Sequence, residues 1–373
     1  MPTILAMRRR LDLLVVSAMV LAVASCSAPD DQTIAASLGA TATTAPTVAT
    51  TSAATAATAP TVATTSTTAA TANADTPGAR ANALCSSDMT LVLGKIANPT
   101  LDETSGLAAS RQHRGVIWAH NDGKRAGLFA VGNDGGDLGF HPITLDGVVD
   151  IEDMAIISGP DGDHVLLGDI GDNGVRRPSI RIYRFAEPDP SVVAPLSDVD
   201  VLEYTYPDGP HNAEVLLVDE INRRVVIVTK EQLRIDGLSS DLGPTAPSFV
   251  FEGPLDVSGD EPVRLGFVGM LDAPLLETRT VSTSPNLISL LGIGGLPTGG
   301  DVAPDGTLIV LRTYETLWVW PRLAGSSVAE SLAADPCQVH VPPEGQGEAV
   351  SFMDGSLITA SEGVNLNLFE VRP

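Results

Sequence analysis

After Cys85 the chain alternates between short apolar runs rich in β-branched residues and turns built on Asp-Gly, Pro-Asp-Gly or Asn-Asp-Gly. Runs of this length, bounded by such turns, predict β-strands, and helical periodicity is nearly absent. One unit recurs: a small or acidic cluster, an apolar strand, a turn, a second strand, and a polar cluster where that strand ends. Repeated four-stranded antiparallel units are typical of the blades of a β-propeller.

Five such units can be counted, and each is expected to run through four strands. First strands are predicted to begin at Thr104, Ile151, Asn212, Gly300 and Gly347. Second strands are predicted at 116–120, 164–168, 224–229, 308–312 and 357–360. Third strands are predicted at 127–131, 180–185, 248–251, 317–320 and 368–371. Weaker fourth strands are predicted at 140–145, 201–206, 263–270 and 338–341.

The fifth unit has no fourth strand before the chain ends. Residues 89–94 can supply that strand from the N-terminal side and so close the ring. We therefore predict an all-β fold, a β-propeller with five blades favoured over six. The segment 275–296 is either an insertion or a degenerate sixth blade. A generic β-sandwich is the alternative fold, but it does not explain the repeated strand starts.

The N-terminal residues follow a different pattern, in which three arginines at 8–10 precede an apolar run at 11–24. A basic segment, an apolar segment and small residues before a cleavage point predict a secretory signal peptide over 1–25. The run is short for a membrane span and contains Asp12. Residues 21–26, Leu-Ala-Val-Ala-Ser-Cys, resemble the lipobox of bacterial lipoproteins. That resemblance implies a lipidated Cys26; a plain signal peptide or an uncleaved anchor is the alternative.

A second segment, 26–81, is predicted to be a disordered tether. Residues 40–72 are almost wholly Thr, Ala, Ser, Val and Pro without charge, and the octet at 45–52 recurs at 59–66. Such a stretch has no apolar face to bury, so ordering it would cost entropy without return. The propeller domain is then expected to span 82–373, held in the cell envelope by the lipid, at the outer face of the cytoplasmic membrane or at the cell surface.

The formal charge of the chain is −24. This excess of acid argues against nucleic acid and against a membrane surface beyond the N-terminal lipid, and it is compatible with divalent cations. We expect a monomer. Besides Cys26 the chain has Cys85 and Cys337, one near each end of the domain. In an oxidising compartment these two are predicted to form a disulfide, with two free buried thiols as the alternative.

The start of a first strand and the end of a second strand lie at the same end of an antiparallel pair. Polar clusters at those points should therefore converge around the central channel. The residues predicted to gather there are Glu103, Asp122, Glu152, Asp169, Asp172, Glu214, Lys230, Asp301, Arg312, Glu348 and Glu362. Asp150, Ser105, Asn173 and Gln346 occupy similar positions.

Three interpretations of this polar ring stay open. Carboxylates suit a hard cation, with Ca²⁺ as the candidate. The candidate metal ligands are Asp122, Glu152, Asp169, Asp172, Glu214 and Asp301. The second interpretation is a ligand pocket, for which the candidates are His120, Asn121, Asn212, Lys230, Arg312, Tyr314, Glu348 and Glu362. In the third, the same residues cap turns and join blades through backbone hydrogen bonds.

Several short runs carry a resemblance to known proteins. They lie at 105–110, 118–122 (Trp-Ala-His-Asn-Asp), 151–155 (Ile-Glu-Asp-Met-Ala), 168–173 (Gly-Asp-Ile-Gly-Asp-Asn), 212–214, 228–230, 311–314, 346–349 and 361–363. The domain resembles a group of secreted bacterial β-propellers that are distantly similar to phytase-like propellers, which hold Ca²⁺ and an inositol phosphate in an acidic channel. The chain shares the acidic channel but not the full metal-ligand motifs, and the resemblance offers only Lys230 and Arg312 as phosphate ligands.

Two functions of different classes follow. The first is a cell-envelope binding propeller whose acidic channel mouth holds a small ligand or an envelope protein, together with a divalent cation. The alternative is a metal-dependent phosphoric-ester hydrolase of phytase-like type. No serine nucleophile elbow, zinc-protease helix or phosphate loop occurs in the sequence, so catalytic residues are not assigned. A scaffold that binds another envelope protein is a third hypothesis.

Overall fold

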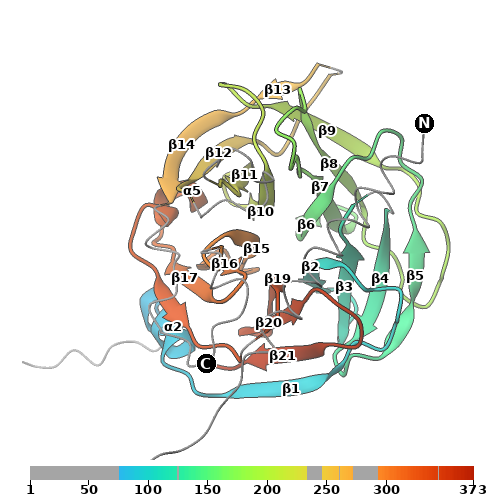
Figure 1. Cartoon of the computed structure of the whole chain (residues 1–373), viewed down its shortest axis with the longest axis vertical. Coiled ribbons are helices and arrows are strands. Elements are labelled where there is room, and N and C mark those ends of the chain that lie inside the picture. Colours follow the sequence, from blue (N-terminus) through green and yellow to red (C-terminus); the bar gives the residue numbers. More distant parts are fainter. Residues whose placement is uncertain (1–74, 124–125, 233–245, 260, 272–292, 343) are drawn as a thin grey trace, which may run out of the picture. The chain divides into compact units, whose positions relative to one another are not determined.

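The repeated sequence units fold as successive antiparallel sheets in a computed structural model of the chain (Figure 1). Residues 75–373 are described, except for 124–125, 233–245, 260, 272–292 and 343. The predicted signal peptide, Cys26, most of the predicted tether and most of the segment 275–296 lie outside the described residues.

Each blade is built on four antiparallel strands, which in the first four blades run outward from the axis in chain order. The first blade contains β2 (Thr104–Ala109), β3 (Val116–Asn121), β4 (Gly127–Gly132) and β5 (Asp137–Pro142). The second contains β6 (Ile151–Gly159), β7 (Gly162–Asp169), β8 (Ile180–Ala186) and β9 (Asp200–Thr205), with the short β13 (Val263–Arg264) added in parallel to β9. The third contains β10 (Ala213–Asp219), β11 (Arg224–Thr229), β12 (Ser248–Pro254) and β14 (Gly266–Leu271).

The fourth blade contains β15 (Pro297–Val302), β16 (Leu308–Thr313), β17 (Leu317–Pro321) and β18 (Cys337–Val339). The fifth contains β19 (Gly347–Met353), β20 (Ser356–Ser361) and β21 (Asn367–Val371). Its outermost strand is β1 (Thr90–Lys95), which pairs with β21 antiparallel. The predicted closure of the ring by an N-terminal strand is therefore confirmed.

The first strands β2, β6, β10, β15 and β19 contact one another in this order around the axis, and β19 returns to β2. The five-bladed propeller predicted from the repeat is confirmed, and the β-sandwich alternative is wrong. Apolar side chains fill the space between consecutive blades. Trp118 of the first blade packs in the same cluster as Tyr183 of the second, and Trp320 of the fourth blade packs in the same cluster as Val226 of the third.

Asp153 joins three inner strands near the axis. Its Oδ1 accepts a hydrogen bond from the Met154 amide at 2.8 Å, and its Oδ2 accepts from the amides of Leu216 in β10 (2.8 Å) and Gly300 in β15 (3.2 Å). Burial raises the pKa of this carboxyl well above its usual value, even though the amide donors act to lower it. One side chain of β6 therefore ties together strands from three of the five blades.

A helix that the sequence analysis did not predict precedes the ring. Helix α2 (Pro77–Cys85) begins inside the segment assigned to the tether, with Thr76 as its N-cap and proline in its first turn. Ala81 and Leu84 are buried in the cluster between the fourth and fifth blades. This burial stabilises a helix that is too short to be stable alone, and the weak apolar pattern of the isolated segment explains why it was missed.

Cys85, the last residue of α2, forms the predicted disulfide with Cys337 of β18, with the two Cα atoms 5.9 Å apart. The bond attaches α2 to the outer strand of the fourth blade, rather than joining two strands.

A second short helix, α5 (Val328–Leu332), begins with a capping box between Ser327 and Glu330 and leads into β18. Within the described residues, no helix has the length and apolar character needed to cross a membrane.

The disulfide closes a loop of 252 residues. Replacing both cysteines (Cys85→Ala with Cys337→Ala) should lower the free energy of unfolding by about 5 kcal/mol, because the cross-link restricts the unfolded chain. Urea titration followed by tryptophan fluorescence measures the change. Reduction of the unmutated protein should have the same effect, and equal stability of the reduced and oxidised forms would contradict this prediction.

Candidate functional site

A pocket of about 190 Å³ lies at the end of the ring where first strands begin and second strands end. We call it the acidic pocket. Its lining residues come from all five blades: Glu103, Thr104, Ser105, Asp122, Glu152, Asn173, Glu214, Lys230, Gln232, Ile293, Tyr314, Gln346, Glu348 and Glu362. The volume corresponds to about six water molecules at their share of the liquid. The pocket therefore suits an ion or a small polar molecule.

One local feature of the strands positions these side chains. In every blade the pairing of the first strand with the second shifts by one residue near the start of the first strand. The residues left out of the pairing are Ser105, Glu152, Glu214, Thr298 and Glu348. A β-bulge of this kind bends the strand and re-aims a side chain. The side chain at this position is therefore redirected in each of the five blades around the axis.

The five bulge residues fall into two groups. Ser105 and Thr298 are bonded to the backbone of the next blade: Ser105 Oγ donates to the Glu152 carbonyl, and Thr298 Oγ1 donates to the Gly347 carbonyl at 2.9 Å. Ser105 also lines the acidic pocket. Glu152, Glu214 and Glu348 bring carboxyl groups to its lining, although all three are buried. Two bulges therefore serve the packing of the blades, and three bring carboxyl groups to the pocket.

Lys230 follows β11 and is the one lysine or arginine among the described lining residues of the acidic pocket. Its Nζ donates hydrogen bonds to Glu214 Oε1 and, at 2.7 Å, to the Tyr314 hydroxyl, and lies 4.7 Å from the centre of the Tyr314 ring. Burial acts to lower the lysine pKa, but the negative charges of Glu214 and Glu348 and the hydrogen bond to Glu214 outweigh it and raise the pKa well above its usual value. Lys230 is therefore a protonated internal counter-ion of Glu214.

A second group of carboxylates lies between the first and second blades. Asp122, Asp150 and Glu152 each offer an oxygen, and these oxygens lie within 4.8 Å of one another. Loss of hydration, followed by repulsion from Asp150 and Glu214, raises the pKa of Asp122 to about 7. Burial and repulsion from Glu214 also raise the pKa of Glu152 well above its usual value. Oxygen ligands in such an arrangement fit a hard divalent cation.

A second observation, independent of the carboxylates, concerns the hydroxyl of Thr104. It lines the same pocket, is 0% exposed, and its Oγ1 has no hydrogen-bond partner among the described residues. A buried hydroxyl without a partner costs free energy, so an unpaired one calls for an explanation. A cation, or a water that the cation holds, would supply the missing interaction.

The fifth blade forms another wall of the pocket. Gln346 Nε2 donates to Glu348 Oε1 at 2.8 Å and also to Glu362 Oε2. Burial is the main cause that raises the pKa of both carboxyls, of Glu348 well above its usual value. Gln346 fixes the two glutamates relative to each other, and their remaining oxygens can accept hydrogen bonds from a ligand.

Three predicted metal ligands lie elsewhere. Asp169 accepts hydrogen bonds from the Asp150 amide and from Arg177 Nη1, both at 2.8 Å. Asp172 accepts from the Arg177 amide at 2.6 Å and from the preceding amide. Asp301 accepts from the Phe352 amide at 2.8 Å. None of these three lines the acidic pocket, and their contacts match the interpretation as turn caps and ties between blades.

Arg312 was expected at the channel mouth but is 0% exposed. Its guanidinium donates to Glu344 Oε2 and to the Thr359 hydroxyl, which joins the fourth blade to the fifth. It packs so tightly against Gly347 that a Cβ added there would lie 1.6 Å from Nη2. The clustering prediction is therefore wrong for Arg312, because an acid later in the chain, Glu344, pairs with it in the interior.

The predicted ligand residues His120, Asn121 and Asn212 are also outside the described lining of the acidic pocket. His120 Nδ1 lies 3.0 Å from the Asn121 carbonyl oxygen, and burial lowers the histidine pKa to about 4. Asn121 Nδ2 donates to the Thr100 carbonyl at 2.7 Å, and Asn212 Oδ1 accepts from the Asp172 amide at 2.6 Å. These side chains organise the loops around the pocket.

The structure brings together Glu103, Asp122, Glu152, Glu214, Lys230, Glu348 and Glu362 of the predicted cluster, with the predicted ligand residue Tyr314. Sequence reasoning missed Thr104, Gln232 and Ile293 as lining residues, and it left Asp150 out of the metal set. Asp150 stands beside Glu152 at a predicted strand start, so its position was a usable signal. Thr104 and Ile293 gave none, since neither residue type points to chemistry.

Comparisons with known proteins add little at the level of sequence. No family model and no curated protein matches the chain. Solved structures that are similar in fold include a chain of a nidogen/laminin complex, at 10% identity and a TM-score of 0.38 over 71% of this chain and 74% of that one. The PQQ-bound aldose sugar dehydrogenase of Streptomyces coelicolor is another, at 14% identity and a TM-score of 0.41 over 76% and 97%.

A third is U3-55K, at 10% identity and a TM-score of 0.34 over 72% of this chain and 68% of that one. Similarities of this size do not carry function across. The propeller assignment rests on the strand pairing and the ring of inner strands in this chain.

The raised carboxyl pKa values predict how stability changes with pH. An unfolded aspartate has a pKa near 3.8, whereas that of Asp122 in the fold is about 7. Between these values the folded chain holds a proton that the unfolded chain has released, so stability falls as pH rises through this window. Without added metal, the melting temperature of the unmutated protein should fall further between pH 5 and pH 8 than that of Asp122→Asn. Parallel curves for the two proteins in differential scanning calorimetry would contradict this.

Proposed function

We propose that the acidic pocket binds a small ligand together with a divalent cation, for which Ca²⁺ is the best candidate. The observation that carries the proposal is the convergence of Asp122, Asp150 and Glu152 in a pocket where Thr104 presents a buried, unpartnered hydroxyl. A cation bound there would offset the repulsion that raises the pKa of Asp122 and Glu152.

The charge of the pocket supports a cation rather than an anion. Six of its lining residues are carboxylic acids, Glu103, Asp122, Glu152, Glu214, Glu348 and Glu362. Lys230 is already paired with Glu214 and bonded to Tyr314. The ligand that accompanies the cation would meet Glu348 and Glu362 as hydrogen-bond acceptors, so hydroxyl or ammonium groups suit that wall.

The hydrolase hypothesis receives no comparable support. It relies on Lys230 and Arg312 to bind phosphate, but Lys230 is engaged by Glu214 and Arg312 by Glu344. Of its expected metal ligands, Asp169 and Asp172 are occupied by arginine and backbone donors. Without free cations a phosphoryl group would enter an acidic pocket against repulsion. We therefore propose a binding function and expect no turnover of a generic phosphomonoester, with or without Ca²⁺.

We also propose that the domain works in the cell envelope, as a monomer attached to the membrane only through a lipid on Cys26. The disulfide between Cys85 and Cys337 supports export, because such bonds persist in oxidising compartments. The lipobox-like sequence before Cys26 supports lipidation. A small ligand, or a protein of the envelope that presents one, would then reach the acidic pocket.

Cation binding is tested on the purified domain by thermal melting. Saturating Ca²⁺ should raise the melting temperature, because a ligand selective for the folded state stabilises that state. Asp122→Asn with Glu152→Gln should lower the affinity for Ca²⁺ at least about tenfold, the change expected when charged ligands of a hard cation are neutralised. Isothermal titration calorimetry measures the affinity.

Asp88→Asn is the matched control, since Asp88 is exposed and outside the acidic pocket. It removes one carboxylate without touching the cluster and should leave the Ca²⁺ affinity unchanged. Melting temperatures that do not respond to saturating Ca²⁺, Mg²⁺ or Mn²⁺ would refute the cation part of the proposal. An equal loss of affinity in the control would show that only the general negative charge matters.

Lipidation is tested separately in a bacterial host that processes lipoproteins. The full chain should incorporate labelled fatty acid and partition with membranes, and Cys26→Ser should abolish both. Cys337→Ser serves as the control, because that cysteine belongs to the disulfide and should not affect labelling. Release of an unlabelled domain into the medium would favour a plain signal peptide.

A further inference from the structure

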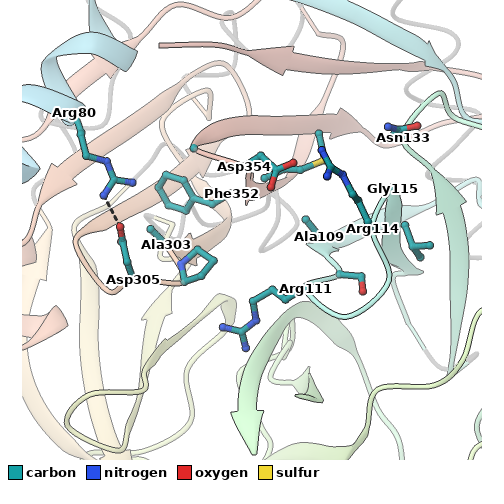
Figure 2. Close-up of a pocket in the computed structure, with 15 residues that line it drawn as sticks. Arg80, Ala109, Arg111, Arg114, Gly115, Asn133, Ala303, Asp305, Phe352 and Asp354 are labelled. Carbon is teal, nitrogen blue, oxygen red and sulfur yellow. Dashed lines mark hydrogen bonds and ion pairs between the residues drawn. The ribbon is translucent and has the colours of Figure 1, made fainter. Parts of the chain in front are cut away.

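A larger cavity, of about 800 Å³, lies at the opposite end of the blades from the acidic pocket (Figure 2). We call it the turn-side cavity, because the turns after first strands line it. The turn between β2 and β3 contributes Ser110, Arg111, Arg114 and Gly115. The turn between β15 and β16 contributes Ala303 to Asp305, and the turn between β19 and β20 contributes Asp354 and Gly355. Helix α2 adds Arg80. Its volume is that of a small-molecule site.

Three arginines line this cavity in a chain with 46 acidic residues and only 22 lysines and arginines. Arg80 is paired with Asp305 and also donates to Thr307 Oγ1 at 2.7 Å. Arg111 and Arg114 both come from the turn between β2 and β3. Figure 2 shows their side chains leaving this turn in different directions, Arg111 toward the side of Asp305 and Arg114 toward the side of Asp354.

Arg111 is held in place but not fully bonded. Its Nη1 donates to Glu220 Oε1 at 3.0 Å, and its Nε lies 3.4 Å from Asp163 Oδ2 in an ion pair. Nη2 and Nε are nonetheless buried without a hydrogen-bond partner among the described residues. Arg111 thus faces two carboxylates of the chain itself, which balance its charge and fix its orientation. It forms part of the cavity wall, and the charge available to a ligand comes from another arginine.

Arg114 adds an available charge. It is exposed, lines the cavity, and forms no hydrogen bond or ion pair with any residue of the described part of the chain. The two acids of the lining differ in their surroundings. Asp305 is already bonded to Arg80 and Thr307, whereas Asp354 is exposed in a turn. Guanidinium groups bind carboxylate and phosphate through paired hydrogen bonds, so Arg114 suits an anionic group.

The remaining wall is apolar. Phe352 and Val116 are largely buried, and Ala303, Pro304 and Met353 complete the surface beside them. Figure 2 shows the Phe352 ring between the Arg80–Asp305 pair and the side of the cavity that carries Arg114. An apolar wall next to an arginine favours a ligand with both an apolar body and a charged group.

We infer that the turn-side cavity is a second binding site, which takes a small organic anion whose carboxylate or phosphate meets Arg114 and whose apolar body contacts Phe352. The inference does not depend on the function of the acidic pocket, because the lining residues of the two sites do not overlap. The two ends of one propeller would then recognise ligands of opposite charge.

Four probes of similar size test the inference: phenyl phosphate and benzoate as anions, benzyl alcohol as the neutral analogue and benzylamine as the cation. Ligand-observed NMR and calorimetry on the oxidised domain should detect the anions, with about tenfold weaker binding of benzyl alcohol and benzylamine, as for the loss of a charge-assisted hydrogen bond. Phenyl phosphate and benzoate distinguish phosphate from carboxylate. Equal binding of all four probes overturns the inference. A failure of both anions to bind also overturns it.

Arg114→Gln should weaken anion binding about fivefold to tenfold, since it removes the charge and retains hydrogen-bonding capacity. This residue has no partner in the described chain, so the variant should fold normally. Arg224→Gln is the matched control, because Arg224 is also exposed and does not line the cavity. Asp122→Asn should leave anion binding unchanged, which separates this site from the acidic pocket. Unaltered binding in Arg114→Gln overturns the inference.

Discussion

The β-bulge near the start of each inner strand is the constraint on which the site of this propeller depends. It occurs at the same register in all five blades and leaves one residue of each first strand out of the pairing. Without it, side-chain alternation would continue unbroken and the following residues would exchange faces. The bulge lets apolar residues such as Val215 and Ala349 remain in the packed layers while Glu214 and Glu348 line the pocket.

Concentrating carboxylates at the axis is unfavourable unless other groups compensate. Part of the compensation is internal: Lys230 neutralises Glu214, and Gln346 donates to Glu348 and Glu362. Another part is the backbone, since Asp153 accepts three amide hydrogen bonds from strands of three blades. Burial is the main reason why the pKa values of Asp122 and Glu152 rise, and repulsion between neighbouring carboxylates adds to it. A cation is proposed there because it would offset that repulsion.

The two ends of the ring are built from different parts of the strand pairs and differ in chemistry. One end carries the bulges and the second-strand ends and is acidic. The other carries the turns, where Arg111 connects the first blade to Glu220 in the third and Arg80 connects helix α2 to Asp305 in the fourth. The disulfide at Cys85 keeps α2 on the fourth blade, so it also holds Arg80 at the turn-side cavity.

The sequence alone favoured five blades over six and predicted the closing strand and the cysteine pair, because turn residues and apolar runs repeat locally and one N-terminal strand remained to complete the fifth blade. It also placed Glu152, Glu214, Lys230 and Glu348 at the channel mouth from strand polarity. Only the tertiary structure decided that Arg312 pairs with Glu344 and that Asp301 bonds to the Phe352 amide. Those partners lie in another blade, which strand periodicity does not identify. Asp301 also lies near the turn end of β15 rather than at its start, because this strand begins at Pro297 and not at Gly300 as predicted.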